Sequence, residues 1–196
     1  PPGFATYVVP EGAVAERLEA ASRPGHFRGV CTVVHILCNL VRPARAYFGQ
    51  KDAQQVAVLR HMVRDLNLPV ELRVLPTVRE ADGLAMSSRN SYLGSEDRAA
   101  ATVLHRALLA GRAATDAGAP AADAAAVLAA MRDALTREPR AEADYVDVCD
   151  PETFEELTQV ASPALLALAV RVGPARLIDN FLLRSDGTWD VGVRAG

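Results

Sequence analysis

The sequence predicts an α/β protein in which a parallel sheet with its helices precedes a smaller α+β unit. Helix-like and strand-like patterns alternate from residue 30 to residue 76, which is the rhythm of βαβ units in a parallel sheet. Alanine-dense helices and then three strand patterns follow residue 94, and these strands look antiparallel. We therefore expect two domains, residues 1–77 and residues 78–196.

The first expected domain begins with a helix over Pro10–Ser22 and a loop over Ser22–Gly29, where a Pro-Gly pair interrupts the periodicity. Val30–Val41 is apolar almost all round, which predicts a buried helix. A buried strand, an amphipathic helix and a second strand are then expected at Arg45–Gly49, Asp52–Leu66 and Val70–Pro76.

The second expected domain begins with a long polar loop, Thr77–Gly94, of the kind that often carries function. Ser95 opens a helix with two acidic residues in its first turn. Two alanine-dense helices extend to about Thr136, with a break near Gly118 and Pro120. Three strands and one short helix complete the domain, the strands at Asp144–Cys149, Leu165–Val172 and Arg176–Leu183 and the helix at Glu152–Thr158.

Composition excludes several classes of function. The net charge is −3 with both signs well mixed, which argues against a basic nucleic-acid-binding surface. The sequence has no run of about 18 apolar residues that would span a membrane. Cys31, Cys38 and Cys149 lie in apolar surroundings, and neither C-x-x-C nor H-x-x-x-H spacing occurs. We expect unpaired thiols in a reducing, intracellular setting, and no metal site.

Polar groups crowd one turn, FGQKDAQQ, between an expected strand and an expected helix. Ligands bind outside the carboxyl ends of strands in open α/β sheets, and a helix N-terminus favours an anion. Gly49 would let a ligand approach the backbone, Lys51 adds positive charge, and Asp52 can cap the helix or accept a hydroxyl hydrogen bond. Gln54 and Gln55 can donate to a carboxylate. A capped helix beside a solvated lysine is an equally supported alternative.

A second polar motif, READGLAMSSRN, lies in the long loop. Ser87, Ser88 and Arg89 offer hydroxyl, amide and guanidinium donors that can surround phosphate oxygens. Met86 would supply an apolar wall. The alternative is a surface loop that ends in a helix cap.

A third group of polar side chains lies in the motif RPGHFRG. Arg23, His26 and Arg28 fall within six residues on an expected loop, so they could bind an anion together. From these residues alone, we prefer the simpler interpretation that they coat a surface.

The chain resembles the pantoate–β-alanine ligase family in four motifs, RPGHFRGV, FGQKDAQQ, PTVREADGLAMSSRNSYL and ARLIDN. They occur in the family's order and cover essentially the whole chain. The resemblance implies a Rossmann-like nucleotidyltransferase domain with an incomplete parallel sheet, followed by a small α+β C-terminal domain that carries the MSSRN loop. It also implies a cytoplasmic homodimer that uses ATP and Mg²⁺ with pantoate and β-alanine.

The resemblance implies a two-step reaction. The pantoate carboxylate attacks the α-phosphate of ATP, giving pantoyl adenylate and pyrophosphate, and the β-alanine amine then displaces AMP to give pantothenate. Such chemistry needs positioning and charge neutralisation rather than a protein nucleophile. The resemblance implies that the following residues contact ATP: Gly49, Gln50, Lys51, Asp52, Val78, Met86, Ser87, Ser88 and Arg89. Four of these contacts are also implied to be catalytic, namely Lys51, Ser87, Ser88 and Arg89. Gln55 would bind pantoate, and Arg23 and His26 would line the site.

Members of this family begin with a strand and a His-x-Gly-His segment that binds ATP phosphates, and this sequence contains no such segment. We therefore expect an N-terminally truncated member that is inactive as an isolated chain. The alternative is a non-catalytic module that retains dimerisation and weak nucleotide binding.

Overall fold

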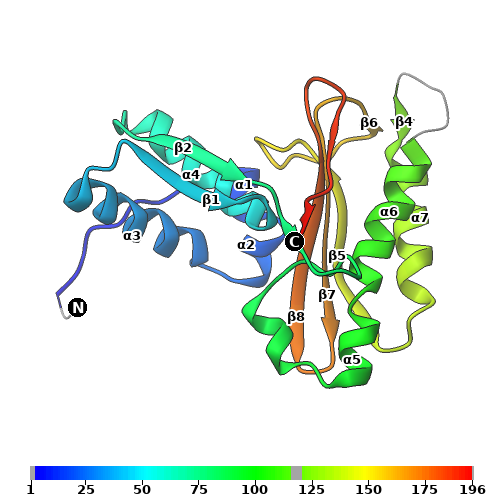
Figure 1. Ribbon diagram of the computed structural model, residues 1–196. Coiled ribbons are helices and arrows are strands. Elements are labelled where there is room, and N and C mark those ends of the chain that lie inside the picture. Colours follow the sequence, from blue (N-terminus) through cyan, green and yellow to red (C-terminus); the bar gives the residue numbers. More distant parts are fainter. Residues whose placement is uncertain (1–2, 116–120, 196) are drawn as a thin grey trace. The chain divides into compact units, whose positions relative to one another are not determined.

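The computed structural model describes residues 3–115 and 121–195 (Figure 1). The chain divides into two compact units. The first comprises Pro1–Leu75 with Glu152–Glu155, and the second comprises Pro76–Pro151 with Glu156–Gly196. Among the described helices, none is both long enough and apolar enough to cross a membrane.

The first unit is built on a parallel pair of strands, β1 (Arg45–Gly49) and β2 (Glu71–Leu75), as predicted. The helix predicted between the strands is confirmed as a short 3-10 turn followed by α4, and α3 packs against α4. The remaining elements of this unit are α1 (Ala13–Glu16), α2 (Glu19–Ser22), α3 (His26–Val41), η1 (Gln50–Asp52) and α4 (Ala53–Asp65).

The N-terminal helix boundaries were predicted incorrectly. The single helix expected over Pro10–Ser22 is wrong because the backbone breaks at Leu18, whose φ of 50° lies outside the right-handed helical region. The loop expected up to Gly29 is also wrong in its second half. Gly25, with φ of 77°, precedes α3, which starts at His26.

The expected burial of α3 and β1 is wrong as well. In α3 only Phe27, Cys31 and Thr32 are buried, and β1 alternates between exposed and half-buried residues. Within the described part of the chain, a two-stranded sheet is too small to cover an all-round apolar helix. The apolar side chains of α3 that are 38–76% exposed are Val33, Ile36, Leu37, Leu40 and Val41.

The second unit is an α+β sandwich (Figure 1). Its main sheet has the antiparallel strand order β5-β7-β8-β9, which confirms the three predicted strands. Two alanine-rich helices, α6 and α7, pack together, and they also pack against strands of the sheet. The strands of this sheet are β5 (Ala141–Cys149), β7 (Ala164–Val172), β8 (Ala175–Leu183) and β9 (Trp189–Asp190), and the helices are α5 (Ser95–Ala100), α6 (Val103–Thr115) and α7 (Ala124–Thr136).

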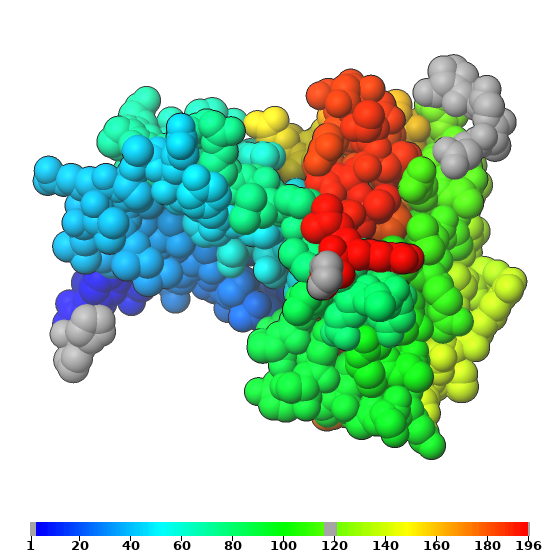
Figure 2. Space-filling model, in the orientation of Figure 1, coloured from blue at the N-terminus to red at the C-terminus, as the bar shows by residue number. Residues whose placement is uncertain are grey.

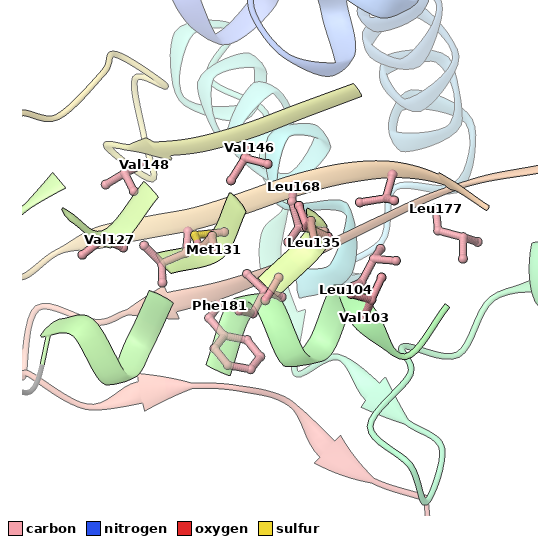
Figure 3. Packing of buried hydrophobic residues seen from close by; sticks show 14 of the residues in the cluster. Val103, Leu104, Val127, Met131, Leu135, Val146, Val148, Leu168, Leu177 and Phe181 are labelled. Carbon is pink, nitrogen blue, oxygen red and sulfur yellow. The ribbon is translucent and has the colours of Figure 1, made fainter. Parts of the chain in front are cut away.

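The core of this unit lies between the helices and the sheet. Figure 3 shows Leu104 of α6, Met131 of α7 and Phe181 of β8 gathered in this layer, and all three are almost completely buried. Burying one such large apolar side chain stabilises the folded state by about 1.5–3 kcal/mol relative to leaving it exposed. The predicted break near Gly118 and Pro120 lies outside the described residues.

Short elements complete the second unit. The helix expected over Glu152–Thr158 is wrong, because Phe154 has φ of 62° and Glu156 forms an isolated bridge with Cys149. The short elements are β3 (Val78–Arg79), η2 (Ser88–Tyr92), β4 (Ala122–Asp123), β6 (Gln159–Val160) and β10 (Val193–Arg194). β10 pairs in parallel with β3, and in Figure 2 the red C-terminal segment lies against the green segment that contains β3.

All three cysteines lie outside any disulfide bond, as predicted. Cys31 and Cys149 are buried, whereas Cys38 is half-buried. Burial raises the pKa of the Cys31 thiol to about 11, so this thiol stays protonated and unreactive near neutral pH.

Candidate functional site

The polar turn of the first unit lies where the sequence predicts it, after β1 and before α4. Gly49 is exposed and extended, with φ of −86° and ψ of 137°, so its conformation does not require glycine. A Cβ built at Gly49 would meet no atom within 4 Å. Neither the backbone conformation nor the packing of the described residues requires a glycine here, and the open space leaves room for a bound molecule to approach the backbone.

Polar and charged side chains follow Gly49 in η1, directly before α4. Gln50 is buried, Lys51 is half-buried and Asp52 is exposed. Asp52 occupies the N-cap position of α4 but makes no capping hydrogen bond through its side chain, so the capped-helix alternative is not what the structure contains. Lys51 is the only lysine in a sequence with 20 arginines.

The two glutamines of this turn have different surroundings. Gln54 is buried and its amide contacts backbone only: Nε2 donates to Val14 O at 2.9 Å and Arg17 O at 2.8 Å, and Oε1 accepts from Glu19 N at 3.0 Å. The expectation that Gln54 could bind a ligand carboxylate is therefore wrong. Gln55 is half-buried, and no such set of backbone contacts holds its amide among the described residues.

The RPGHFRG residues meet at a pocket of about 450 Å³ in the first unit. Arg23, His26 and Arg28 all line it, and Arg23 Nη1 lies 3.1 Å from His26 Nε2. The Arg28 guanidinium also lies 4.7 Å from the centre of the Tyr7 ring. The structure thus brings together two cations and an imidazole, which can attract an anion.

The MSSRN loop of the second unit follows a small hairpin. Arg79 and Ala85 form an antiparallel bridge, and Met86 N donates to Val78 O at 2.9 Å. Val78 and Met86 are exposed on this hairpin, 43% and 51% respectively. Val78 also pairs with Val193 of β10, which is exposed as well. The exposed apolar side chains of Val78, Met86 and Val193 therefore lie on neighbouring segments.

The donors predicted to bind phosphate occupy η2 and the residue before it. Ser87 is the N-cap of η2, and its hydroxyl accepts from Arg89 N at 3.2 Å. Ser88 and Arg89 are exposed. The capped turn that the surface-loop alternative predicts is present, and it leaves the donors of Ser88 and Arg89 exposed to solvent.

Ion pairs that sequence reasoning missed hold the turn of the hairpin that precedes MSSRN. Arg98 of α5 donates to Asp82 Oδ2 at 2.7 Å and to Glu80 Oε2 at 2.5 Å. The pKa values of both carboxyl groups are lowered, chiefly by their hydrogen bonds to Arg98. Asn90 Nδ2 donates to Glu80 Oε1 at 2.9 Å and to Ala85 O at 3.1 Å, which ties the end of MSSRN back to the hairpin. The two carboxylates precede Arg98 by 16 and 18 residues, a separation at which no periodic pattern would reveal the pairs.

A family profile described as Pantoate-beta-alanine ligase matches residues 2–182. The pantothenate synthetase of Chloroflexus aurantiacus is 57% identical over 188 residues, which are 95% of this chain and 66% of that protein. The pantothenate synthetase of Herpetosiphon aurantiacus is 56% identical over 184 residues, 93% of this chain and 66% of that protein. The chain therefore spans about two thirds of the length of these curated relatives.

Solved structures show the same relationship. The crystal structure of pantothenate synthetase from Thermus thermophilus matches with a TM-score of 0.87 at 50% identity, covering 92% of this chain and 64% of that one. The ligase of Francisella tularensis, described as complexed with beta-gamma ATP and beta-alanine, matches with a TM-score of 0.67 at 30% identity, covering 92% of this chain and 59% of that one. These matches confirm the predicted fold, a Rossmann-like nucleotidyltransferase with a C-terminal domain. Profile, sequence identity and fold agree, and the chain belongs to the pantoate-beta-alanine ligase family.

Proposed function

We propose that this chain works in an ATP-dependent ligase that joins pantoate to β-alanine through a pantoyl-adenylate intermediate, releasing pyrophosphate and AMP. The family match carries the proposal. It is supported by the turn after β1, where Gly49 is open to solvent and the chain's only lysine follows it. In a chain that otherwise uses arginine, a single lysine at this place suggests a role for a compact ammonium group.

The proposed roles follow from the chemistry of each group. Lys51 and Arg89 neutralise charge on the ATP phosphates as pyrophosphate leaves. Ser87 and Ser88 supply hydroxyl and backbone donors to the same oxygens. Gln55 orients the pantoate carboxylate for in-line attack without acting as a nucleophile.

The remaining predicted contacts belong to the nucleoside and the edge of the site. The backbone of Val78 meets adenine, the side chain of Met86 forms an apolar wall, and Asp52 faces the ribose. The backbone of Gly49 and Gln50 lies beside the nucleotide. Arg23 and His26, which share the first unit's pocket, are weaker candidates that line the site.

Mg²⁺ accompanies the ATP in this proposal. The ion is usually held by substrate phosphates, water and one or two carboxylates rather than by a dedicated protein cage. Its role is to neutralise phosphate charge, which complements Lys51 and Arg89. We further propose that residues 1–77 bind ATP and pantoate, that residues 78–196 supply the MSSRN loop, and that the ligase is a cytoplasmic homodimer.

Pantothenate formation from ATP, pantoate and β-alanine tests the proposal. The assay compares the 196-residue chain with a full-length ligase, made by joining to this chain the part of the Chloroflexus aurantiacus enzyme that it does not span. We expect the full-length ligase to form pantothenate and the short chain to form little or none. A folded full-length ligase without activity would contradict the proposal and favour a non-catalytic module.

A further inference from the structure

A buried ion pair joins the hairpin before MSSRN to the central sheet of the second unit. Arg79 of β3 and Asp179 of β8 are 3% and 2% exposed. Two parallel hydrogen bonds connect them, Nη1 to Oδ2 at 2.6 Å and Nη2 to Oδ1 at 2.9 Å. Asp179 belongs to the ARLIDN motif, to which the proposed reaction assigns no role.

The Arg79 guanidinium also binds three backbone carbonyls. Nη1 donates to Gly83 O at 3.0 Å, Nη2 to Asn180 O at 3.5 Å, and Nε to Val191 O. These acceptors lie in the hairpin, in β8 and just before β10. One side chain therefore fixes three segments that are far apart in the sequence.

The hairpin transmits this anchoring to the loop. Arg79 pairs with Ala85 in an antiparallel β-bridge, and Met86, the residue after Ala85, donates a backbone hydrogen bond to Val78 O. Ser87 therefore follows directly after the hydrogen-bonded part of the hairpin. The turn of η2 packs against β8, the strand that carries Asp179. A shift of Arg79 would therefore move the phosphate-binding donors together with the apolar wall.

We propose that Arg79 and Asp179 are positioning residues for nucleotide binding. They hold the hairpin so that Met86, Ser87, Ser88 and Arg89 meet ATP in one geometry. The inference rests on the proposed ligase function. A purely structural pair would affect stability but would not change the affinity for ATP specifically.

The test uses the full-length ligase and the variants Arg79→Lys and Asp179→Asn, with KM measured separately for ATP and for β-alanine. A misplacement of about 1 Å in a positioned group can reduce the rate on the order of a hundredfold. We expect kcat/KM for ATP to fall about tenfold to a hundredfold in each variant. The KM for β-alanine should stay within about twofold, because the proposed site assigns this loop to the nucleotide and not to β-alanine.

Two controls make the outcome specific. Arg176 and Asp144 form another ion pair of this unit, with Nε to Oδ2 at 2.8 Å, and it joins β8 to β5 rather than to the hairpin. Arg176→Lys and Asp144→Asn should leave the KM for ATP unchanged. If the buried single variants do not fold, the double variant Arg79→Met, Asp179→Asn removes both charges together, and its KM for ATP should rise as in the single variants.

The possible failures are distinguishable. A wild-type ligase that forms no pantothenate would overturn the proposed function. A wild-type ligase that is active, together with folded Arg79 or Asp179 variants whose KM for ATP and kcat are unchanged, would overturn only the positioning role. Equal losses for ATP and β-alanine would overturn it too, because they would indicate general damage.

Discussion

The side chain of Gln54 accepts a hydrogen bond from the backbone N–H of Glu19, 35 residues earlier in the sequence, at 3.0 Å. The same amide donates to the carbonyls of Val14 and Arg17. One buried glutamine at the start of α4 thus satisfies three backbone groups around the break between α1 and α2. Its neighbour Gln55 is the residue proposed to bind pantoate. Of these two adjacent glutamines, one therefore stabilises the fold and the other is assigned to the substrate.

Gln54→Ala is expected to lower the free energy of unfolding by about 2–4 kcal/mol, because three backbone groups that are buried or partly buried lose their hydrogen-bond partner. Gln55→Ala is the matched control for stability and should change it by no more than about 0.5 kcal/mol. Urea unfolding of the first unit measures both. In the full-length ligase, Gln55→Ala should instead raise the KM for pantoate. Equal stability losses in the two variants would contradict this division of tasks.

Two glycines should respond differently to alanine. Gly83 has φ of 94°, and a Cβ there would lie 2.2 Å from Cδ2 of His105. Gly83→Ala should therefore destabilise the second unit by more than about 1 kcal/mol. Gly49→Ala should leave the thermal unfolding temperature unchanged, since its Cβ would point into open space, but should weaken ATP binding. Unchanged ATP affinity in Gly49→Ala would argue against a nucleotide beside this glycine.

His105 makes the stability of the second unit depend on pH. Burial, and next the charge of Arg79, lower the pKa of His105 below its ordinary value of 6.5. Arg194 also lowers it, whereas Asp179 and Asp82 oppose the shift, and the imidazole packs edge-on against Phe181. As the pH falls through 6.5, the unfolded chain takes up a proton that the folded protein resists, so stability should decrease.

The measurement for His105 compares urea midpoints at about pH 7.5 and pH 5.5, on either side of the unfolded histidine pKa. The wild-type protein should lose more stability between these values than His105→Gln does, because only the wild type has this proton to take up. The other three histidines are present in both proteins, so their contribution to the pH dependence of stability cancels when the two losses are subtracted. Identical losses would show that His105 titrates alike in the folded and unfolded states.

Local patterns predicted the elements that local forces determine. The strands β1 and β2 and the helix α4 follow from short apolar runs and a clear helical period. The break at Leu18 was not predictable, because its strained backbone is held by Gln54, a partner distant in sequence. An all-round apolar pattern such as that of α3 indicates a helix but cannot show which layers cover it.

In the candidate site, too, the sequence reveals the residues that are neighbours along the chain but not the contacts between distant residues. The turn after β1 and the MSSRN loop were recognisable because their donors are consecutive in the sequence. Arg79 and Asp179 were not, since they are 100 residues apart and have no shared pattern. Arg98 and its carboxylates were missed for the same reason, although they hold the loop.

The nature of the cation at position 51 offers a separate prediction. Lys51→Arg keeps the charge but replaces a compact ammonium with a larger planar group, which is not equivalent at a close phosphate contact. We expect this variant to lose most of the ligase activity while it unfolds at the wild-type temperature. Full activity of Lys51→Arg would show that positive charge alone is sufficient there.

Pantoate-dependent exchange of pyrophosphate into ATP tests the central claim most directly, because it reports adenylation without β-alanine. In the full-length ligase, Lys51→Ala should reduce this exchange on the order of a hundredfold to a thousandfold, the effect of losing one donor that stabilises developing charge. Arg60→Ala, an exposed cation further along α4, should retain it. Near-normal exchange in a folded Lys51→Ala ligase would contradict the proposed role of this turn in binding and activating ATP.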